Sequence, residues 1–101
     1  MLFLVELAQD LPMPSEADEQ SVLKERVCTT LEVLAGMEGI YGGVIAGGRK
    51  IVFIVDSESP ETLDVWLQEL PLWALVDRVG VVPLVSFRTR LQYNRSERRE
   101  T

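Results

Sequence analysis

The sequence has no histidine, and Cys28 is its single cysteine. Histidine is the commonest general base and a frequent metal ligand, so its absence excludes nucleophile–histidine relays and zinc sites built on histidine or paired cysteines. One cysteine cannot form an internal disulfide, and no signal-like segment opens the chain, which together indicate a cytoplasmic protein. We expect no metal and no cofactor.

Positive charge is scarce before residue 78. Residues 1–77 contain fourteen acids and four bases, residues 78–101 contain two acids and six bases, and the whole chain carries a net charge of −6. An acidic chain repels nucleic acid and anionic membranes, and its apolar runs fall far short of the roughly 20 residues that cross a bilayer. The expected partner of the basic end is an acidic surface, on this chain or on a neighbouring subunit.

The patterns that are present alternate between strand and helix. Periods of two and of three to four predict a strand in residues 1–9, a helix from about Glu16 to Gly36, strands at Ile40–Ala46 and Lys50–Asp56, a helix from Pro60 to before Pro71, and a strand within residues 78–87. This β-α-β-β-α-β order is the ferredoxin-like pattern, an α+β fold with a four-stranded antiparallel sheet and two helices on one face. We expect this domain to span residues 1–88, and residues 89–101 to form a loosely ordered basic tail that docks on a neighbouring subunit.

Local signals mark the ends of these elements. Ser15 begins a near capping box, and Ser59 is the predicted cap of the second helix. Gly36 predicts a left-handed end of the first helix, and Gly47–Gly48 predicts a tight hairpin turn. Gly42–Gly43 indicates a bulge, or a place where a backbone or ligand comes close to the sheet.

Both faces of the predicted sheet are apolar. One set of side chains consists of Leu2, Leu4, Ile51, Phe53 and Val55, and the alternate set consists of Phe3, Val5, Val52 and Ile54. Two helices can cover one face only, and a sheet with one wet face should alternate apolar with polar residues. A large exposed apolar face predicts a partner surface, so we expect sheet-to-sheet dimerisation around a shared interior.

The segment "ELPLWALVD", residues 69–77, stays apolar where the second helix should have ended. Pro71 stops that helix, whose inward face is already supplied by Leu63, Trp66, Leu67 and Leu70. We therefore interpret Leu72, Trp73 and Leu75 as a pocket wall or a subunit contact rather than as part of the chain's own core.

Short motifs follow one another along the chain: "MLF" at the start, "LP" at 11–12, "IAG" at 45–47, "S-x-E-x-L" at 59–63 and "LPLW" at 70–73, followed by Asp77. In this order they resemble muconolactone isomerase and its relatives among the dimeric α+β barrel proteins, over about residues 1–88. The resemblance implies a cofactor-free enzyme that moves a double bond in an unsaturated lactone by proton transfer. It also implies a pocket shared between subunits.

The catalytic positions that the resemblance implies differ in this chain. Such a reaction needs a base near the acidic carbon, and cations for the substrate carboxylate and the developing enolate. The family pattern implies a histidine and a lysine in the first strand, an arginine before "IAG" and a histidine after it, whereas this chain has Leu4, Glu6, Val44 and Gly48. The family's catalytic residues are therefore largely absent.

Glu6 is the leading candidate base, because it is the only charged residue in an otherwise apolar strand and lies on the face assigned to the barrel interior. Tyr41 and Ser86 are the remaining polar groups in mid-strand and are candidates to polarise a substrate. Each has a structural alternative. The hydroxyls could bond to backbone or water, and Glu6 could form an ion pair with Arg49, Lys50 or Arg88.

The expected substrate-binding residues are Leu4, Val44, Phe53, Trp73 and Arg49. Arg49 is suited to an anionic ligand, and its structural alternative is a solvated residue of the hairpin turn. The predicted function is a muconolactone isomerase-like protein that binds a small apolar or carboxylated molecule, with isomerisation by proton transfer if it is an enzyme. The alternative is a non-catalytic, homo-oligomeric ligand-binding or assembly protein whose site has filled with apolar side chains. A small monooxygenase on the same barrel has little residue-level support.

Overall fold

The computed structural model describes residues 1–10, 14–46 and 49–100, without the side chains of residues 98–100. Its elements in chain order are β1 (Leu2–Ala8), α1 (Ala17–Gly36), β2 (Tyr41–Val44), β3 (Lys50–Asp56), α2 (Pro60–Gln68), a short 3₁₀ helix η1 (Trp73–Leu75), β4 (Arg78–Leu84) and α3 (Phe87–Glu100). The β-α-β-β-α-β order is confirmed. The predicted Gly47–Gly48 turn and the "LP" motif at 11–12 lie outside the described residues.

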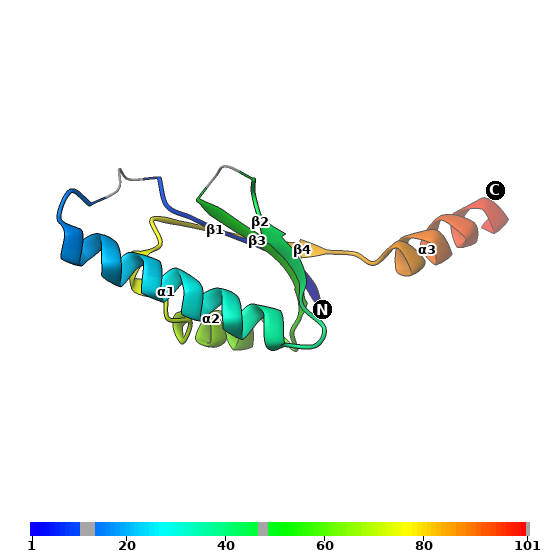
Figure 1. Cartoon of the computed structure of the whole chain (residues 1–101). Coiled ribbons are helices and arrows are strands. Elements are labelled where there is room, and N and C mark those ends of the chain that lie inside the picture. The colour runs from blue at the N-terminus through cyan, green and yellow to red at the C-terminus, as the bar shows by residue number, and fades with distance from the viewer. Residues whose placement is uncertain (11–13, 47–48, 101) are drawn as a thin grey trace.

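The four strands form one antiparallel sheet in the order β2-β3-β1-β4. Helices α1 and α2 lie on the same face of this sheet (Figure 1). Strand β4 is at the edge, where Pro83 is tolerated because an edge strand can lack one ladder donor. This is the predicted ferredoxin-like α+β architecture. None of the described helices has the length and apolarity needed to cross a membrane.

The core lies between the sheet and its two helices. In the β1–β3 register Phe3 is opposite Val55, Val5 opposite Phe53 and Leu7 opposite Ile51, and opposite residues of an antiparallel pair point to the same face. All six are buried, and they are covered by Leu23 and Leu34 from α1 and by Leu63 and Leu67 from α2. The predicted grouping of Ile51, Phe53 and Val55 with Leu2 and Leu4 is wrong, because a register that differs by one residue moves a whole strand's side chains to the other face.

The second face of the sheet has no helix over it. We call it the open face, and it consists of Leu2, Leu4, Glu6, Tyr41, Val52, Ile54, Gly80, Val82 and Leu84 with charged residues at its ends. Ile54 is 37% exposed, Val82 51% and Tyr41 73%. The predicted apolar second face is therefore present, and within one chain it is uncovered.

The predicted helix ends are partly correct. Ser59 caps α2, since its hydroxyl accepts a hydrogen bond from the Thr62 amide at 3.1 Å. The Ser15 prediction is wrong, because α1 begins after Glu16 and no side chain caps it. Gly36 ends α1 without a left-handed conformation, and the positive φ of 81° occurs at Gly39 in the turn before β2.

The segment 69–77 contributes to the chain's own core. Leu70 and Leu72 are buried in it, and Trp73 is half-buried against it. The fully buried Thr30 hydroxyl donates to Arg26 O at 2.8 Å and accepts from the Leu72 amide at 3.0 Å. The interpretation that placed Leu72 outside the core is wrong, because this bond to α1 draws the segment inward in a way that apolar spacing does not reveal.

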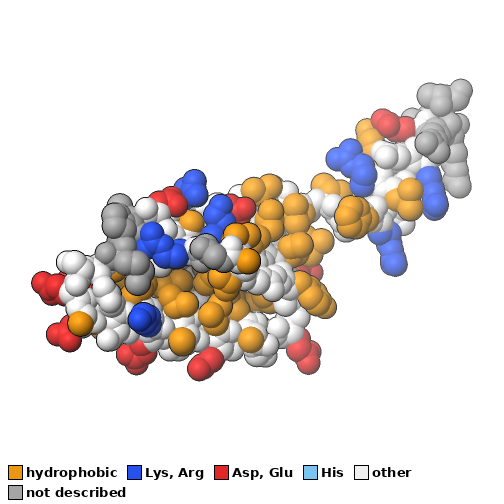
Figure 2. Space-filling model, turned by 45° about the horizontal axis from the view of Figure 1, so that its top comes forward, with side chains coloured by type: hydrophobic (Ala, Val, Ile, Leu, Met, Phe, Trp, Pro, Cys, Tyr) orange, Lys and Arg blue, Asp and Glu red, His pale blue; other side chains and the backbone are white. Residues whose placement is uncertain are grey.

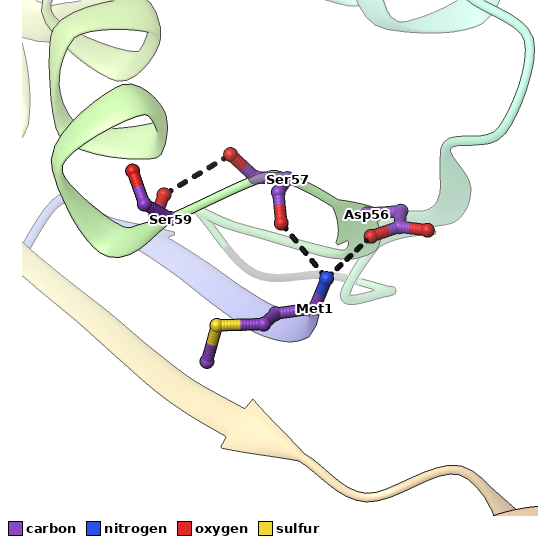
Figure 3. Close-up of polar contacts among 4 residues, drawn as sticks. All are labelled: Met1, Asp56, Ser57 and Ser59. Atoms are coloured by element: carbon purple, nitrogen blue, oxygen red, sulfur yellow. Dashed lines mark hydrogen bonds and ion pairs between the residues drawn. The ribbon is translucent and has the colours of Figure 1, made fainter.

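The start of β1 is tied to the end of β3. The Met1 amino group donates to Asp56 Oδ1 at 2.8 Å and to Ser57 O at 2.9 Å (Figure 3). The Ser57 amide donates back to Met1 O at 2.8 Å, and the Ser57 hydroxyl donates to Ser59 O at 3.1 Å. These bonds hold β1 against the residues that lead into α2.

Residues 87–100 form a helix, so the prediction of a loosely ordered tail is wrong. Ser86 caps this helix: its hydroxyl accepts from the Thr89 amide at 3.1 Å, and its carbonyl accepts from the Arg90 amide at 3.0 Å. Helix α3 projects away from the rest of the molecule (Figure 1). The radius of gyration is 17.3 Å, against about 13 Å for a compact domain of this length. We refer to α3 as the arm and to residues 1–84 as the body.

Candidate functional site

Helix α1 and the sheet enclose an inner cavity of about 150 Å³. Its apolar walls are Leu7, Val27, Leu31, Val44, Ile51, Leu72 and Val76. Its polar residues are Gln9, Arg49 and Lys50, which are neighbours where β1 ends and β3 begins. An apolar slot with a few polar groups is the usual form of a small-molecule site.

A larger outer groove of about 510 Å³ shares Gln9 and Arg49 with the inner cavity. Its apolar residues are Pro14, Val22, Leu23, Ala74 and Leu75, and its acidic residues are Asp18, Glu19 and Asp77. The groove therefore lies between the first turns of α1 and the η1 segment. A molecule that enters the inner cavity from this side passes Arg49.

Hydrogen bonds to backbone carbonyls fix the junction between groove and cavity. The Gln9 amide donates to Arg49 O at 3.1 Å, and Gln9 Nε2 donates to Leu75 O at 3.0 Å. The Asp77 amide donates to Ala8 O at 3.0 Å. The Arg49 guanidinium has no carboxylate within 4.0 Å among the residues that the structure describes. Its charge is therefore available to an anion.

A third cavity of about 270 Å³ shares Leu31 and Ile51 with the inner one and extends toward Phe53 and Gly42. A Cβ at Gly42 would lie 2.5 Å from Phe53 Cα and would collide with the Val52 carbonyl, whereas Gly43 has open space. The predicted close approach of a backbone is therefore confirmed at Gly42, where only glycine fits.

The predicted substrate-binding residues are divided by the sheet. Val44 and Arg49 line the inner cavity together, and Phe53 lines the adjoining third cavity, with its ring edge-on to Trp66 at 5.9 Å. Trp73 lines none of these three cavities, although its neighbours Leu72 and Ala74 do. Leu4 lies on the open face, away from all three cavities.

The predicted catalytic residues are not brought to the inner cavity. Glu6 lies on the open face beside Gly80, with its side chain 45% exposed and Oε2 3.8 Å from Lys50 Nζ. Tyr41 is on the same face at the start of β2 rather than in mid-strand, opposite Ile54. Ser86 lies beyond the end of β4, where its hydroxyl serves the arm's first turn, so its prediction as a mid-strand residue is wrong.

Sequence reasoning named Leu72 as a candidate pocket wall, and Leu72 does line the inner cavity, but Gln9 and Val76 were missed. Gln9 had a detectable signal, since it is a polar residue at the end of an apolar strand. Leu72 and Val76 reach the inner cavity only because the segment between α2 and β4 folds under α1. No periodic pattern in the sequence indicates that path.

The β2-β3-β1-β4 antiparallel sheet with two helices on one face defines a ferredoxin-like α+β protein. No protein-family model matches the sequence, and no curated protein matches it. Among solved structures, the crystal structure of muconolactone isomerase is similar with a TM-score of 0.66 and 26% identity, covering 85% of this chain and 90% of that chain. The chain is therefore muconolactone isomerase-like, as its motifs predict.

A second similar structure is 5-chloro-2-hydroxyhydroquinone dehydrochlorinase from Burkholderia phenoliruptrix, in complex with 2,5-dihydroxybenzoquinone. Its TM-score is 0.52 at 18% identity, covering 87% of this chain and 97% of that chain. At this identity the likeness supports the fold alone, and it agrees with the predicted fold class.

Proposed function

We propose that this protein binds a small, largely apolar molecule with an anionic group in the inner cavity between α1 and the sheet. The observation that carries the proposal is Arg49, which stands where the apolar cavity meets the outer groove and has no carboxylate partner in the described part of the chain. A guanidinium beside apolar walls favours a ligand with a carboxylate at one end, because the two groups can form a bidentate pair.

The cavity limits the size of the ligand. At about 150 Å³ it is smaller than the roughly 300–1,000 Å³ of drug-sized pockets. A single small ring or short chain therefore fits, with its apolar part against Leu31, Ile51 and Leu72 and its anionic group toward Arg49. A carboxylated unsaturated lactone has this form, and the likeness to muconolactone isomerase supports that class of ligand.

Self-association is part of the proposal. Contiguous apolar surface of this kind is rarely left bare on a soluble monomer, and Leu4, Ile54 and Val82 all contribute to it. A second open face is the matching cover, because two apolar sheet faces pack closely against each other. A cytoplasmic location, expected from the single cysteine, belongs to the same proposal.

A second candidate function is cofactor-free proton transfer at Glu6. This carboxylate is the only one in the interior of the open face, and Lys50 Nζ lies 3.8 Å from it. Glu6 would remove a proton beside a substrate carbonyl and return it to another carbon, so that the double bond moves and no atom is lost. Lys50 would stabilise the negative charge of the intervening enolate.

The binding proposal is tested by thermal shift with a panel of small unsaturated carboxylated lactones and benzoates. A ligand that binds only the folded state stabilises it by about 2.7 kcal/mol at a hundredfold excess over its Kd. We expect Arg49→Gln to abolish this stabilisation. The matched control is Arg78→Gln, because Arg78 pairs with Asp10 at 3.1 Å and lines none of the three cavities. An equal shift in wild type and Arg49→Gln would refute the proposal.

A further inference from the structure

The arm has two kinds of surface side by side. Phe87 and Leu91 are four residues apart and so lie on one side of the helix, and they are 97% and 48% exposed. Arg88 and Arg95 flank this apolar stripe on one side and Arg90 on the other. Figure 2 shows hydrophobic and basic side chains together on the projecting arm. The arm is therefore an amphipathic, basic helix with its apolar stripe open to solvent.

An arm of this length needs a surface to pack on. It has fourteen residues, and isolated helices shorter than roughly 12–15 residues are marginal in water because nucleation is costly. Most helical stability in proteins comes from packing an apolar stripe. The stripe of the arm is not packed on its own body.

The outer groove has the complementary surface. Its apolar residues include Val22 and Leu75, and Asp18 and Glu19 from the first turn of α1 stand beside them. Val22 is 47% exposed, so this apolar surface is open to a partner. Apolar residues flanked by carboxylates match an apolar stripe flanked by arginines, and such complementarity selects the partner and its orientation.

The arm cannot place its stripe in the groove of its own chain. Asp77 lines the groove, and the seven residues of β4 then run away from it to Leu84, a distance of about 20 Å at roughly 3.3 Å per residue. Only Val85 and Ser86 connect β4 to Phe87, and two residues span no more than about 7 Å. The first turns of α1, which form one wall of the groove, thus lie at the opposite end of the molecule from the arm (Figure 1).

We propose that the arm of one copy docks in the outer groove of a second copy. Phe87 and Leu91 then pack on Val22 and Leu75, and the arginines of the arm lie beside Asp18 and Glu19. Because one copy gives its arm and the other its groove, the contact joins two different surfaces and is distinct from pairing of open faces. One consequence rests on the proposed function: the neighbour's arm would cover the side of the inner cavity that adjoins the groove at Gln9 and Arg49.

The first test is a cross-link that can form only between copies. In a Cys28→Ser background, Leu91→Cys chains are mixed with Val22→Cys chains and oxidised. We expect a high yield of the mixed disulfide dimer. The matched control replaces Val22→Cys by Val33→Cys, because Val33 is also exposed on α1 but lies outside the groove. Equal yields from both mixtures, or no cross-link in either, would overturn the docking contact.

The second test measures assembly by light scattering of the full chain. Arg88→Glu with Arg95→Glu should lower the mass, while circular dichroism shows an unchanged body. Adding Asp18→Lys with Glu19→Lys should restore the mass, whereas Glu61→Lys with Asp64→Lys on α2 should not. An unchanged mass in the Arg88→Glu, Arg95→Glu variant contradicts the inference. So does a wild-type protein that stays monomeric in light scattering while its arm binds DNA or anionic vesicles. Neither test uses a ligand, so their failure would leave the binding proposal standing.

Discussion

The two faces of the sheet carry similar apolar side chains but have different surroundings. On the covered face Phe3, Val5 and Phe53 are at most 2% exposed, whereas on the open face Ile54 and Val82 are 37% and 51% exposed. Phe53 and Ile54 are adjacent in β3 and differ in little but the direction in which they point. Apolar composition alone therefore does not tell which face a chain covers with its own helices.

What distinguishes the faces is the placement of polar groups. Among the described residues, the covered face has no charged side chain in its interior positions, and the one buried polar side chain, Thr30 of α1, is fully hydrogen-bonded. The open face has Glu6 in its middle and Tyr41 at its margin. Burial of unpaired polar groups is costly, so the covered face, which has none among the described residues, is the face that suits the chain's own core.

The largest expected loss of stability comes from a large-to-small substitution on the covered face. Phe53→Ala should destabilise the protein by about 3–5 kcal/mol, because it removes a buried ring and enlarges the void beside it. It also removes the edge-on contact with Trp66. Urea denaturation measures the loss in free energy of unfolding, at protein concentrations low enough for the copies to be dissociated.

The matched control for Phe53→Ala is its neighbour on the open face. Ile54→Ala should cost roughly half as much or less, since part of that side chain is already in water. If Phe53→Ala and Ile54→Ala lowered the free energy of unfolding of the dissociated chain equally, the two faces would contribute equally to its stability.

A smaller loss of stability is expected at the hydrogen bond that joins α1 to the segment 69–77. Thr30→Val keeps the shape of the side chain but leaves the Leu72 amide without its acceptor, which should cost about 1–3 kcal/mol. Thr29→Val is the control, because Thr29 is exposed and bonds only to Glu25 O in its own helix. Its free energy of unfolding should change by no more than about 0.5 kcal/mol. Equal losses of stability in Thr30→Val and Thr29→Val would mean that the bond between α1 and the segment 69–77 does not stabilise their packing.

The sequence predicts the order of strands and helices because periodicity depends on neighbouring residues. It does not reveal which face is covered, since Ile51 and Phe53 follow the same alternation as Val52 and Ile54 and only the register with β1 assigns them. The family motifs led to Val44, and positive charge at the hairpin end led to Arg49; the structure brings both residues to the inner cavity. They could not exclude Ser86, because its role as the cap of α3 depends on a helix that the polar tail did not suggest.

The smallest expected change in stability is at Glu6. A substitution there therefore tests for a chemical role of the carboxylate with little effect on the fold. Its pair with Lys50 is long, at 3.8 Å, and half-exposed, so Glu6→Gln should alter the free energy of unfolding by only about 0–1 kcal/mol. If Glu6 is the base that we propose as the second candidate, the same variant loses isomerisation of a carboxylated unsaturated lactone while retaining the thermal shift that Arg49 supplies. Full turnover in Glu6→Gln would instead refute Glu6 as the base. The open face would then be proposed only as an assembly surface, and the inner cavity as the ligand-binding site.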